Sequence, residues 1–536
     1  MAFLALCCDA HPREVAATDG SAGARSGEPE KPAFVPYPDG WTFTFGPSRG
    51  VPRVLPTPAG YLFSALELQE RFIDSEGHAV SPAGRHLVAE IDPDRIWLWQ
   101  LGFEGDFSLA HVAADRIAVV AETADPDSKP LELVVSRAVL TVYERGEEIW
   151  SDSWRVTPAI GEDSQIAALG DGTFVVWTGQ ADEPLALEPG TVLPQWTARL
   201  RHYTADGLLV SDSAIPNRRQ VTMANTKDGD VYILGKREQV EASGLICLER
   251  RRVDGEQLWE SCFGTEHAEP RAVLALSNGG AAVLVNNVAT FDVDEDFDAS
   301  PERELHLQPQ VPGYFLRGSA LVLVNDAGHL LSALPMYATD TTIASALAED
   351  SEGTIYVGGT IRGEGLLFEH EWLTYSDDLF VAKFTPDGVA QGARVWGGIG
   401  VETLESLAID DDDSIIAGGS FTDRVNFGQG GETDVFVAGT EPNGSAFLTK
   451  FRFYPEQVAE YPQVDCDPLP VMYIAPDFQA CLESDRGTQY GRDCDERYFD
   501  DDDPGYDECL EYGSLMPASD DVPSYCQVTY DAFSCP

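Results

Sequence analysis

The chain is poor in positive charge. Of its 536 residues, 35 are lysine or arginine and 90 are aspartate or glutamate, which gives a formal net charge of −55 at pH 7. A nucleic-acid backbone must be met by clustered lysine and arginine, so this balance excludes a nucleic-acid binder and disfavours an anionic membrane surface. No run of about 18 apolar residues is present, so the sequence predicts no transmembrane segment. With 43% hydrophobic residues, the chain can still bury a large core.

Motifs of several enzyme classes are also missing. The sequence contains no Gly-x-Ser-x-Gly nucleophile elbow, no His-Glu-x-x-His zinc motif and no Walker loop. Hydrolases, metalloproteases and nucleotide triphosphatases that depend on these motifs therefore have no support. An enzyme that gathers its catalytic groups from different parts of the fold would leave no such motif, so that class stays open.

The ten cysteines fall in three places along the chain. The C-terminal region has no Cys-x-x-Cys pair and no histidine after His370, which argues against a zinc site there. We therefore predict three disulfides in that region, in one of about 15 pairings, and hence an oxidising, extracytoplasmic compartment. The cysteines are Cys7 and Cys8, then Cys247 and Cys262, then Cys466, Cys481, Cys494, Cys509, Cys526 and Cys535.

The middle pair of cysteines lies in a predicted hairpin. Strands over 244–253 and 256–264 flank Asp254-Gly255, a preferred two-residue turn. In that register Cys247 stands opposite Cys262, and we predict a disulfide between them. Two buried free thiols are the alternative.

The N-terminal residues 1–8 look like the end of a signal sequence whose beginning is missing. Leu4-Ala5-Leu6-Cys7 resembles a lipoprotein processing box, in which Cys7 would become the lipidated first residue, although Leu6 is larger than usual. Residues 9–33 read as a flexible acidic linker. The alternative is a secreted protein without an anchor.

Internal repeats indicate the fold. Residues 346–361 resemble residues 406–421, with Gly358-Gly359 and Gly418-Gly419 lying 60 positions apart. Residues 378–388 resemble residues 434–444, at an offset of 56. We interpret each repeat as four strands with a short turn after the first strand and another after the third.

The two short turns can be followed back along the chain as two interleaved series of seven. Seven four-stranded units match a β-propeller, so we predict an all-β fold with seven four-stranded blades over residues 34–455. The first series comprises Pro58-Ala59-Gly60, Ala114-Asp115-Arg116, Asp171-Gly172, Asp228-Gly229, Asn278-Gly279, Glu352-Gly353 and Asp412-Asp413. The second comprises Pro93-Asp94, Arg145-Gly146, Asp206-Gly207, Asp254-Gly255, Ala327-Gly328, Asp387-Gly388 and Asn443-Gly444.

The last two units resemble a known family. The Gly-Gly strand, the stretch Asp-x-Phe-Val-Ala-Lys-Phe-x-x-Asp-Gly at 378–388 and the ending Trp396-Gly-Gly are similar to the SBBP-type β-propeller repeats of bacterial cell-surface proteins. The match covers residues 342–452, and earlier units keep only the turn pattern. The resemblance implies an exported seven-bladed propeller and no settled activity.

Four tryptophans and several long connections occupy repeated positions. Trp97, Trp150, Trp259 and Trp396 follow the second turn, where we expect them to pack between blades. The long connections 124–133, 180–196, 290–318 and 363–376 should share one face, which makes that face the candidate binding surface, with idle insertions as the alternative. The aromatic residues of these loops are Tyr314, Phe315, Trp372 and Tyr375.

Two strongly acidic segments are candidates for a metal site and for a separate module. In the longest loop Asp292, Asp294, Asp296 and Asp298 alternate, so an extended chain would direct four carboxylates to one side, as a calcium site requires. Solvated charges are the alternative, because the loop does not match an EF-hand. Residues 456–536 hold 20 acidic and three basic residues, and we predict a small disulfide-rich C-terminal module there.

These features favour an exported, monomeric, non-catalytic scaffold that binds a protein or polysaccharide partner at the cell surface, as a lipoprotein of the outer membrane or as a secreted protein. No cofactor is indicated apart from calcium. A hydrolase, lyase or dehydrogenase with its site at the central channel is the alternative, and it predicts acidic or histidine side chains of perturbed protonation there. A structural component of the envelope is the second alternative.

Overall fold

The computed structural model describes residues 40–453 apart from 46–47, 49, 67–71, 74–78, 81–85, 104–106, 114, 125–135, 157–163, 181–196, 217, 238–245, 264–267, 287–289, 293–303, 307–317, 339–340, 368–369, 398–399, 428–434 and 438–443. All regular elements in this part of the chain are β-strands. The predicted segments 1–8, 9–33 and 456–536 lie outside the described residues, so their organisation stays a prediction.

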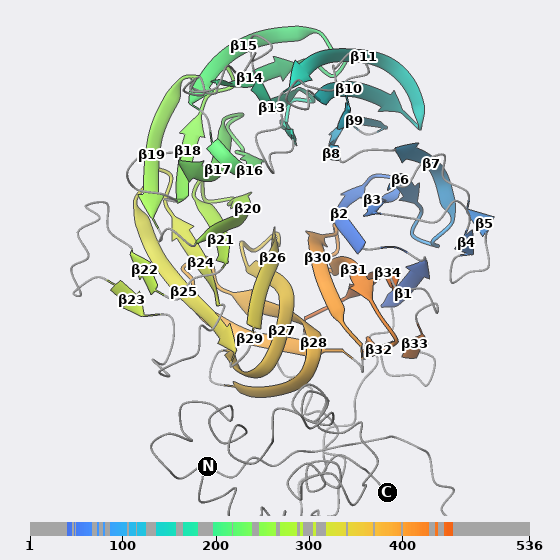
Figure 1. Ribbon diagram of the computed structural model, residues 1–536, viewed down its shortest axis with the longest axis vertical. Helices are drawn as coiled ribbons and strands as arrows, with labels where there is room; N and C mark the ends of the chain where they lie inside the picture. The colour runs from blue at the N-terminus through green and yellow to red at the C-terminus, as the bar shows by residue number, and fades with distance from the viewer. Residues whose placement is uncertain are drawn as a thin grey trace, which may run out of the picture. The chain divides into compact units, whose positions relative to one another are not determined.

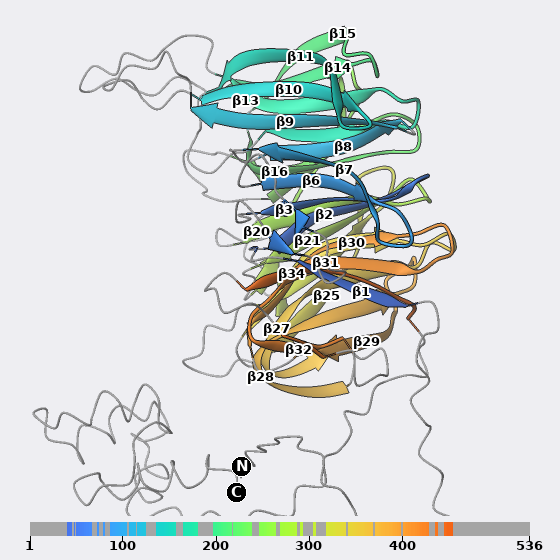
Figure 2. The same cartoon turned by 90° about the vertical axis from the view of Figure 1, so that its right-hand side faces the viewer.

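Seven antiparallel blades of four strands stand side by side around one axis, which confirms the predicted β-propeller (Figure 1, Figure 2). The first strands of successive blades lie next to one another around that axis. From inner to outer strand, the first four blades are blade 1, β2 (Gly50–Thr57), β3 (Gly60–Leu66), β6 (His86–Ile91) and β7 (Trp97–Phe103); blade 2, β8 (Phe107–Ala113), β9 (Arg116–Ala124), β10 (Ser136–Glu144) and β11 (Glu147–Val156); blade 3, β12 (Gln165–Ala168), β13 (Phe174–Gln180), β14 (Thr197–Tyr203) and β15 (Leu209–Pro216); blade 4, β16 (Arg218–Asn225), β17 (Val231–Arg237), β18 (Ile246–Arg251) and β19 (Gln257–Phe263).

The remaining blades follow the same plan, except that the last one uses a strand from the other end of the chain. They are blade 5, β20 (Glu269–Ala275), β21 (Ala281–Asn286), β24 (Ser319–Val324) and β25 (Leu330–Ala338); blade 6, β26 (Thr341–Glu349), β27 (Ile355–Leu367), β28 (His370–Phe384) and β29 (Ala390–Trp396); blade 7, β30 (Glu402–Ile409), β31 (Ile415–Phe421), β34 (Ser445–Phe451) and β1 (Trp41–Phe45).

Blade 7 is closed by β1, which pairs with β34 in the register Trp41↔Lys450 to Phe45↔Ala446. The hydroxyls of Thr42 and Thr449 share a hydrogen bond of 3.0 Å across this pair. The outermost strand of the last blade therefore precedes the first blade in sequence. Pairing the two ends of the propeller in one sheet closes the ring and keeps it from opening at this seam.

This closure corrects the predicted repeat alignment. Phe380 stands opposite Gly359 in blade 6, and Phe447 stands opposite Gly419 in blade 7, so residues 445–451 are the counterpart of residues 378–384. The segment that we had aligned, residues 434–444, instead contains β33 (Val435–Val437), which forms a two-stranded ribbon with β32 (Arg424–Asn426). Asn443-Gly444 is therefore not the second turn of its blade. The error arose because a short apolar segment in the ribbon mimics the third blade strand.

Most of the described short turns have three-residue loops, including Asp254-Gly255, for which we predict a two-residue loop; Arg145-Gly146 does form a two-residue loop, because Glu144 pairs with Glu147. At Asp254-Gly255, the N–H of Gly255 donates to the carbonyl of Arg252, and the N–H of Arg252 donates to the carbonyl of Glu256, both at 2.9 Å. Gly255 has a φ of 92°, the left-handed conformation that follows a type I turn in such loops. Ten of the described hairpins repeat this hydrogen-bond pattern.

The hydrophobic core lies mainly between successive blades. One cluster joins Tyr232 and Leu248 of blade 4 to Val283 and Val322 of blade 5, all of them buried. A blade therefore buries its two faces against its neighbours, as the seven-fold ring requires.

The connections between second and third strands carry further β-structure. Residues 363–376, predicted as a loop, mostly continue β27 and β28 as a long hairpin, with Gly365 opposite Trp372. The backbone of β27 also pairs with β25 at Tyr337↔Leu366, so blades 5 and 6 share one sheet. Shorter ribbons are β4 (Phe72–Ile73) with β5 (Ala79–Val80), and β22 (Thr290–Asp292) with β23 (Glu304–His306).

Candidate functional site

The predicted disulfide between Cys247 and Cys262 is present, with an S–S distance of 2.04 Å. The two residues stand directly opposite each other on β18 and β19. The predicted register is confirmed, but it arises in another way. The three-residue turn shifts the pairing next to it by one residue, so that Arg251 stands opposite Gln257. A bulge at Leu258 then restores the predicted pairing for the rest of the hairpin. The Cα atoms lie 4.0 Å apart, as in the closer kind of antiparallel pair.

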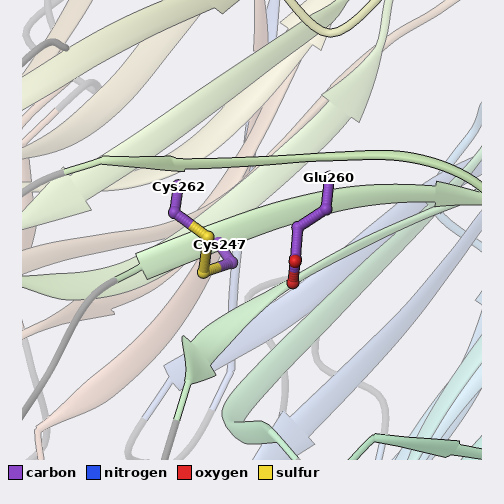
Figure 3. A group of neighbouring side chains, drawn as sticks. All are labelled: Cys247, Glu260 and Cys262. Carbon is purple, nitrogen blue, oxygen red and sulfur yellow. A yellow bond between two sulfur atoms is a disulfide. The ribbon is translucent and has the colours of Figure 1, made fainter. Parts of the chain in front are cut away.

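Glu260 lies beside this disulfide, and its carboxylate and both sulfurs fall within 4.8 Å of one another (Figure 3). Among the described residues, this is the one group of three side chains with the spacing of metal ligands. The sulfurs are already bonded to each other, and the carboxylate of Glu260 accepts a hydrogen bond from Arg218. We therefore interpret the group as a disulfide next to an ion pair, not as a metal centre.

Blade 4 buries further charges in the same place. Arg218 and Glu249 are 2% and 0% exposed, and Nη2 of Arg251 lies 2.7 Å from Oε2 of Glu249. Buried charges of this kind are tolerated because each is paired. This network orders the hairpin that carries the disulfide, and the sequence contained no signal for it.

Most other predicted site residues lie outside the described part of the chain. These are the lipidation site Cys7, the calcium ligands Asp294, Asp296 and Asp298, and the cysteines Cys466, Cys481, Cys494, Cys509, Cys526 and Cys535. Asp292 ends β22, where its backbone pairs with Glu304. The predicted loop residues Tyr314 and Phe315 also lie outside the described residues. Trp372 and Tyr375, which we predict in a loop, belong to strand β28.

The tryptophans pack between blades, as predicted. Nε1 of Trp259 in blade 4 donates a hydrogen bond of 2.8 Å to the carbonyl of Asp326 in blade 5, and Trp150 in blade 2 lies 5.7 Å from the ring of Tyr203 in blade 3. Trp99, which the prediction missed, occupies the corresponding place in blade 1 and covers the turn glycine Gly146 of blade 2. These tryptophans are structural.

A different pattern marks the innermost strands. In blades 5, 6 and 7 a single residue of the first strand has no partner on the second strand, which is a β-bulge. The three bulged residues are Arg271, Ser345 and Glu405. Bulges are common next to functional sites because they turn a side chain out of the regular alternation. The three residues stand on consecutive blades and form the candidate site, which we call the axial cluster.

Glu405 is the central member of the axial cluster. Its carboxylate lies against Gly50 of blade 1, where a Cβ atom would overlap it. Oε2 of Glu405 is buried and has no hydrogen-bond partner among the described residues. Burial raises the pKa of Glu405 to about 7, although the charge of Arg271 and the backbone N–H of Val51 both favour the ionised form.

The other two members differ in their surroundings. The hydroxyl of Ser345 donates to the carbonyl of Leu404, so it joins blade 6 to blade 7. Arg271 is exposed and acts on Glu405 through its charge. Arg53, on the same strand as Gly50, is also enclosed by protein, and burial lowers its pKa. The cluster thus combines a carboxyl group whose pKa is about 7 with one exposed arginine, and a second, enclosed arginine lies on the neighbouring strand β2.

The charge of the inner strands differs from that of the whole chain. The seven first strands carry four arginines and four glutamates, whereas the chain carries 35 basic and 90 acidic residues. The positive and negative charges of the innermost strands are therefore equal in number, although the protein as a whole is strongly acidic. Of these charges, that of Arg271 acts on Glu405, although the two residues stand 134 positions apart in sequence. Sequence reasoning missed them because the bulge that aligns them is not visible as a motif.

Comparisons with known proteins give no family for this chain. No protein-family model matches it, and no curated protein matches it. Similar solved structures include the hydrazine synthase of Kuenenia stuttgartiensis, at 10% identity over 69% of this chain and 93% of that one, with a TM-score of 0.41. The β-propeller domain of the Trilobed protease from Pyrococcus furiosus matches at 10% identity over 63% and 85%, with a TM-score of 0.35.

A third similar structure is the polysaccharide lyase Uly1, at 9% identity over 75% of this chain and 89% of that one, with a TM-score of 0.38. Likenesses at these TM-scores carry no argument about activity. The propeller fold itself follows from the blade topology. Within the described residues, no helix has the length and apolarity to cross a membrane.

Proposed function

We propose that this protein is an exported, non-catalytic scaffold that binds a protein or polysaccharide partner through the axial cluster. The observation that carries the proposal is the exposed side chain of Arg271 on the innermost strand of blade 5, whose charge acts on Glu405 of blade 7. A rigid scaffold with a few convergent polar groups is a common form of binding site.

The position of the cluster in the blades supports the same proposal. Arg271 and Glu405 are the third and fourth residues of strands β20 and β30. These strands begin at the face onto which the connections between second and third strands open, because every short turn lies at the opposite face. A partner held by the axial cluster would therefore also meet the long connections, where binding residues usually reside.

The test is a capture experiment with the oxidised full chain immobilised and exposed to cell-envelope and extracellular-polymer fractions. Arg271→Ala is the variant, and Arg252→Ala is the control because Arg252 is exposed in a short turn of blade 4, where it pairs with Glu256. We expect a partner that the wild-type protein and Arg252→Ala retain and Arg271→Ala releases. Equal retention by all three proteins would place the binding surface elsewhere.

A propeller enzyme is the second candidate, and the raised pKa of Glu405 favours it. A carboxyl group with a pKa of about 7 can act as a general acid or base at neutral pH. A polysaccharide that wild-type protein depolymerises and Glu405→Gln does not would replace the scaffold proposal. The rate would then follow the ionisation of one group with an apparent pKa near that of Glu405.

The remaining elements of the proposal concern export. We propose that Cys7 carries a lipid or is removed on secretion, that the six C-terminal cysteines form three disulfides, and that Asp292, Asp294, Asp296 and Asp298 bind calcium. Intact mass under non-reducing conditions counts the disulfides and shows any lipid. Running the capture experiment with calcium and with EDTA tests the acidic loop.

A further inference from the structure

We infer that reduction turns the disulfide hairpin of blade 4 into a site for a divalent metal ion that prefers thiolates, such as Zn²⁺, held by Cys247, Cys262 and Glu260. In the oxidised chain the two sulfurs are bonded to each other and cannot serve as ligands. In the reduced chain the metal would replace the disulfide as the link between β18 and β19. The site lies in blade 4 and is independent of the partner binding proposed for the axial cluster.

The strand register brings the three ligand groups together. Cys247 stands opposite Cys262, and Glu260 precedes Cys262 by two residues, so its side chain leaves β19 on the same face. A carboxylate oxygen of Glu260 and both sulfurs lie within 4.8 Å of one another (Figure 3). A zinc ion, with bonds of about 2.0–2.3 Å to sulfur and oxygen, can reach all three after small side-chain rotations. Water can then fill the fourth position of a tetrahedral ion.

The group can be reached from solvent at the edge of the blade. Strand β19 is the outermost strand of blade 4. Cys247 is buried, whereas Cys262 is partly exposed and the side chain of Glu260 is 21% exposed. A reductant and a metal ion therefore have an approach from the side of Cys262 and Glu260.

The reduction step requires a dithiol as the reductant. One thiolate of the dithiol attacks the sulfur of Cys262, the more exposed cysteine, and a mixed disulfide forms while the sulfur of Cys247 leaves and takes up a proton. The second thiol of the reductant then displaces the sulfur of Cys262 and closes a disulfide within the reductant. The protein gains two electrons and two protons, which the reductant loses. Binding of Zn²⁺ afterwards releases the two protons from the thiols.

The charges around the hairpin balance in both forms. Two arginines of blade 4, Arg218 and Arg251, are buried there. They pair with the carboxylates of Glu249 and Glu260, so the positive and negative charges next to the disulfide cancel. Two thiolates and one divalent ion also cancel, whereas two thiolates without a metal ion would leave two uncompensated negative charges beside buried groups. Both cysteines can therefore ionise when the metal binds.

The ion pair between Arg218 and Glu260 is compatible with metal binding. A carboxylate has two oxygens, so Glu260 can ligate a metal through one while the other accepts a hydrogen bond from Arg218. Nη2 of Arg218 also lies 3.6 Å from Oε2 of Glu249, which gives the guanidinium a second anionic partner. Carboxylate ligands of metal ions are commonly hydrogen-bonded in this way, which fixes their orientation.

The two sulfurs decide the class of metal. Thiolates are soft ligands that favour Zn²⁺, whereas Ca²⁺ and Mg²⁺ prefer oxygen ligands. Calcium therefore serves as the negative control for this site.

The first experiment reduces the folded full chain with dithiothreitol, removes the reductant, adds Zn²⁺ and counts the bound ions by native mass spectrometry. Because the chain contains other cysteines, the measured quantity is the difference between the wild type and Cys247→Ser/Cys262→Ser. We expect the reduced wild type to hold one more Zn²⁺ ion than the double variant, and the oxidised proteins to hold equal numbers. Ca²⁺ should show no difference. Equal zinc contents after reduction would overturn the inference.

Alkylation followed by peptide mass analysis examines the two cysteines directly. In the reduced wild type, Zn²⁺ should protect Cys247 and Cys262 from alkylation, and EDTA should restore their reactivity. A disulfide that resists the dithiol in the folded chain, or equal alkylation with and without Zn²⁺, would contradict the proposed site. Tryptophan fluorescence checks that the chain stays folded after reduction, and unfolding at this step would contradict it as well.

Glu260→Gln tests the third ligand while both cysteines stay in place. Glu256→Gln is the matched control, because Glu256 is exposed in the turn of the same hairpin and pairs with Arg252. In competition with a chromogenic zinc chelator, reduced Glu260→Gln should hold the hairpin ion at least about tenfold more weakly than the wild type, and Glu256→Gln should behave as the wild type. This comparison also decides the matter if the double cysteine variant does not fold. Equal affinities of all three proteins would overturn the assignment of Glu260 as a ligand.

Discussion

The hydroxyl of Tyr61 in blade 1 donates a hydrogen bond of 2.7 Å to Oδ2 of Asp410 in blade 7. This contact crosses the seam at which the two ends of the propeller meet. Nζ of Lys450, on the strand that pairs with β1, lies 2.6 Å from the same oxygen. Burial, together with the carboxylate of Asp410, raises the pKa of Tyr61 to about 12. The carboxylate of Asp410 therefore links blade 1 to β34, the strand of blade 7 that pairs with β1.

Tyr61→Phe should weaken this closure. Removing the hydroxyl deprives Asp410 of one hydrogen bond to a charged group, and we expect the free energy of unfolding to fall by about 1–2 kcal/mol. Tyr203→Phe is the matched control, because the Tyr203 hydroxyl is buried without a hydrogen-bond partner among the described residues. Urea unfolding should show no loss for Tyr203→Phe. Equal loss in both variants would mean that the seam hydrogen bond contributes nothing.

Two turn glycines separate backbone strain from crowding between blades. Gly229 and Gly328 have φ values of 85° and 87°, but a Cβ at Gly229 would meet nothing within 4 Å, whereas one at Gly328 would lie 2.8 Å from the ring of Trp259. Gly229→Ala should cost about 1–2 kcal/mol for the left-handed conformation. Gly328→Ala should cost about 1–3 kcal/mol more because it overpacks the interface of blades 4 and 5. Thermal unfolding of the two variants measures the difference, and equal costs would contradict the packing role of Trp259.

Removing the disulfide of blade 4 should destabilise the propeller. In Cys247→Ala/Cys262→Ala the unfolded chain regains the freedom of a 15-residue loop, which corresponds to about 3 kcal/mol. The comparison is made by urea unfolding of both oxidised proteins, so that any other disulfides stay intact. A double variant as stable as the wild type would show that the buried charges of this hairpin suffice to hold it.

Asp412 should contribute stability that disappears in acid. Burial alone would raise its pKa, but hydrogen bonds from Ser414 and the charge of Lys450 outweigh burial and lower the pKa from 3.8 to about 2. Because the folded-state pKa is the lower one, the contribution is complete above the unfolded-state pKa and is lost as the pH falls from about 4 to about 2. Asp412→Asn should therefore be less stable than the wild type near neutral pH, with a difference that vanishes near pH 2.

Urea unfolding at a series of pH values measures this difference. Asp411→Asn controls for the loss of one negative charge in the same turn, because Asp411 is exposed. A pH-independent difference for Asp412→Asn would indicate that its charge plays no part. Because Asp412 is partly exposed, solvent screens its charge, and the effect should be modest.

The cysteine pairing shows how a sequence prediction can be right for an incomplete reason. The position of Cys247 opposite Cys262 followed from assuming a two-residue turn at Asp254-Gly255, and the register is correct. The actual turn has one residue more, and the bulge at Leu258 compensates for it. Turn residues indicate where a chain reverses, but the hydrogen bonds of the neighbouring strands decide the loop length.

The sequence by itself determined the number of blades, because the first turn of each blade is specified by a few adjacent residues, such as Glu352-Gly353, and recurs once in each of the seven units. The same local signals placed the tryptophans between blades. Only the tertiary structure decided that β1 closes blade 7, that Glu405 lies against Gly50 and that the charge of Arg271 acts on Glu405. These interactions join residues more than 130 positions apart, and they arise from ring closure and from bulges, which leave no pattern among neighbouring residues.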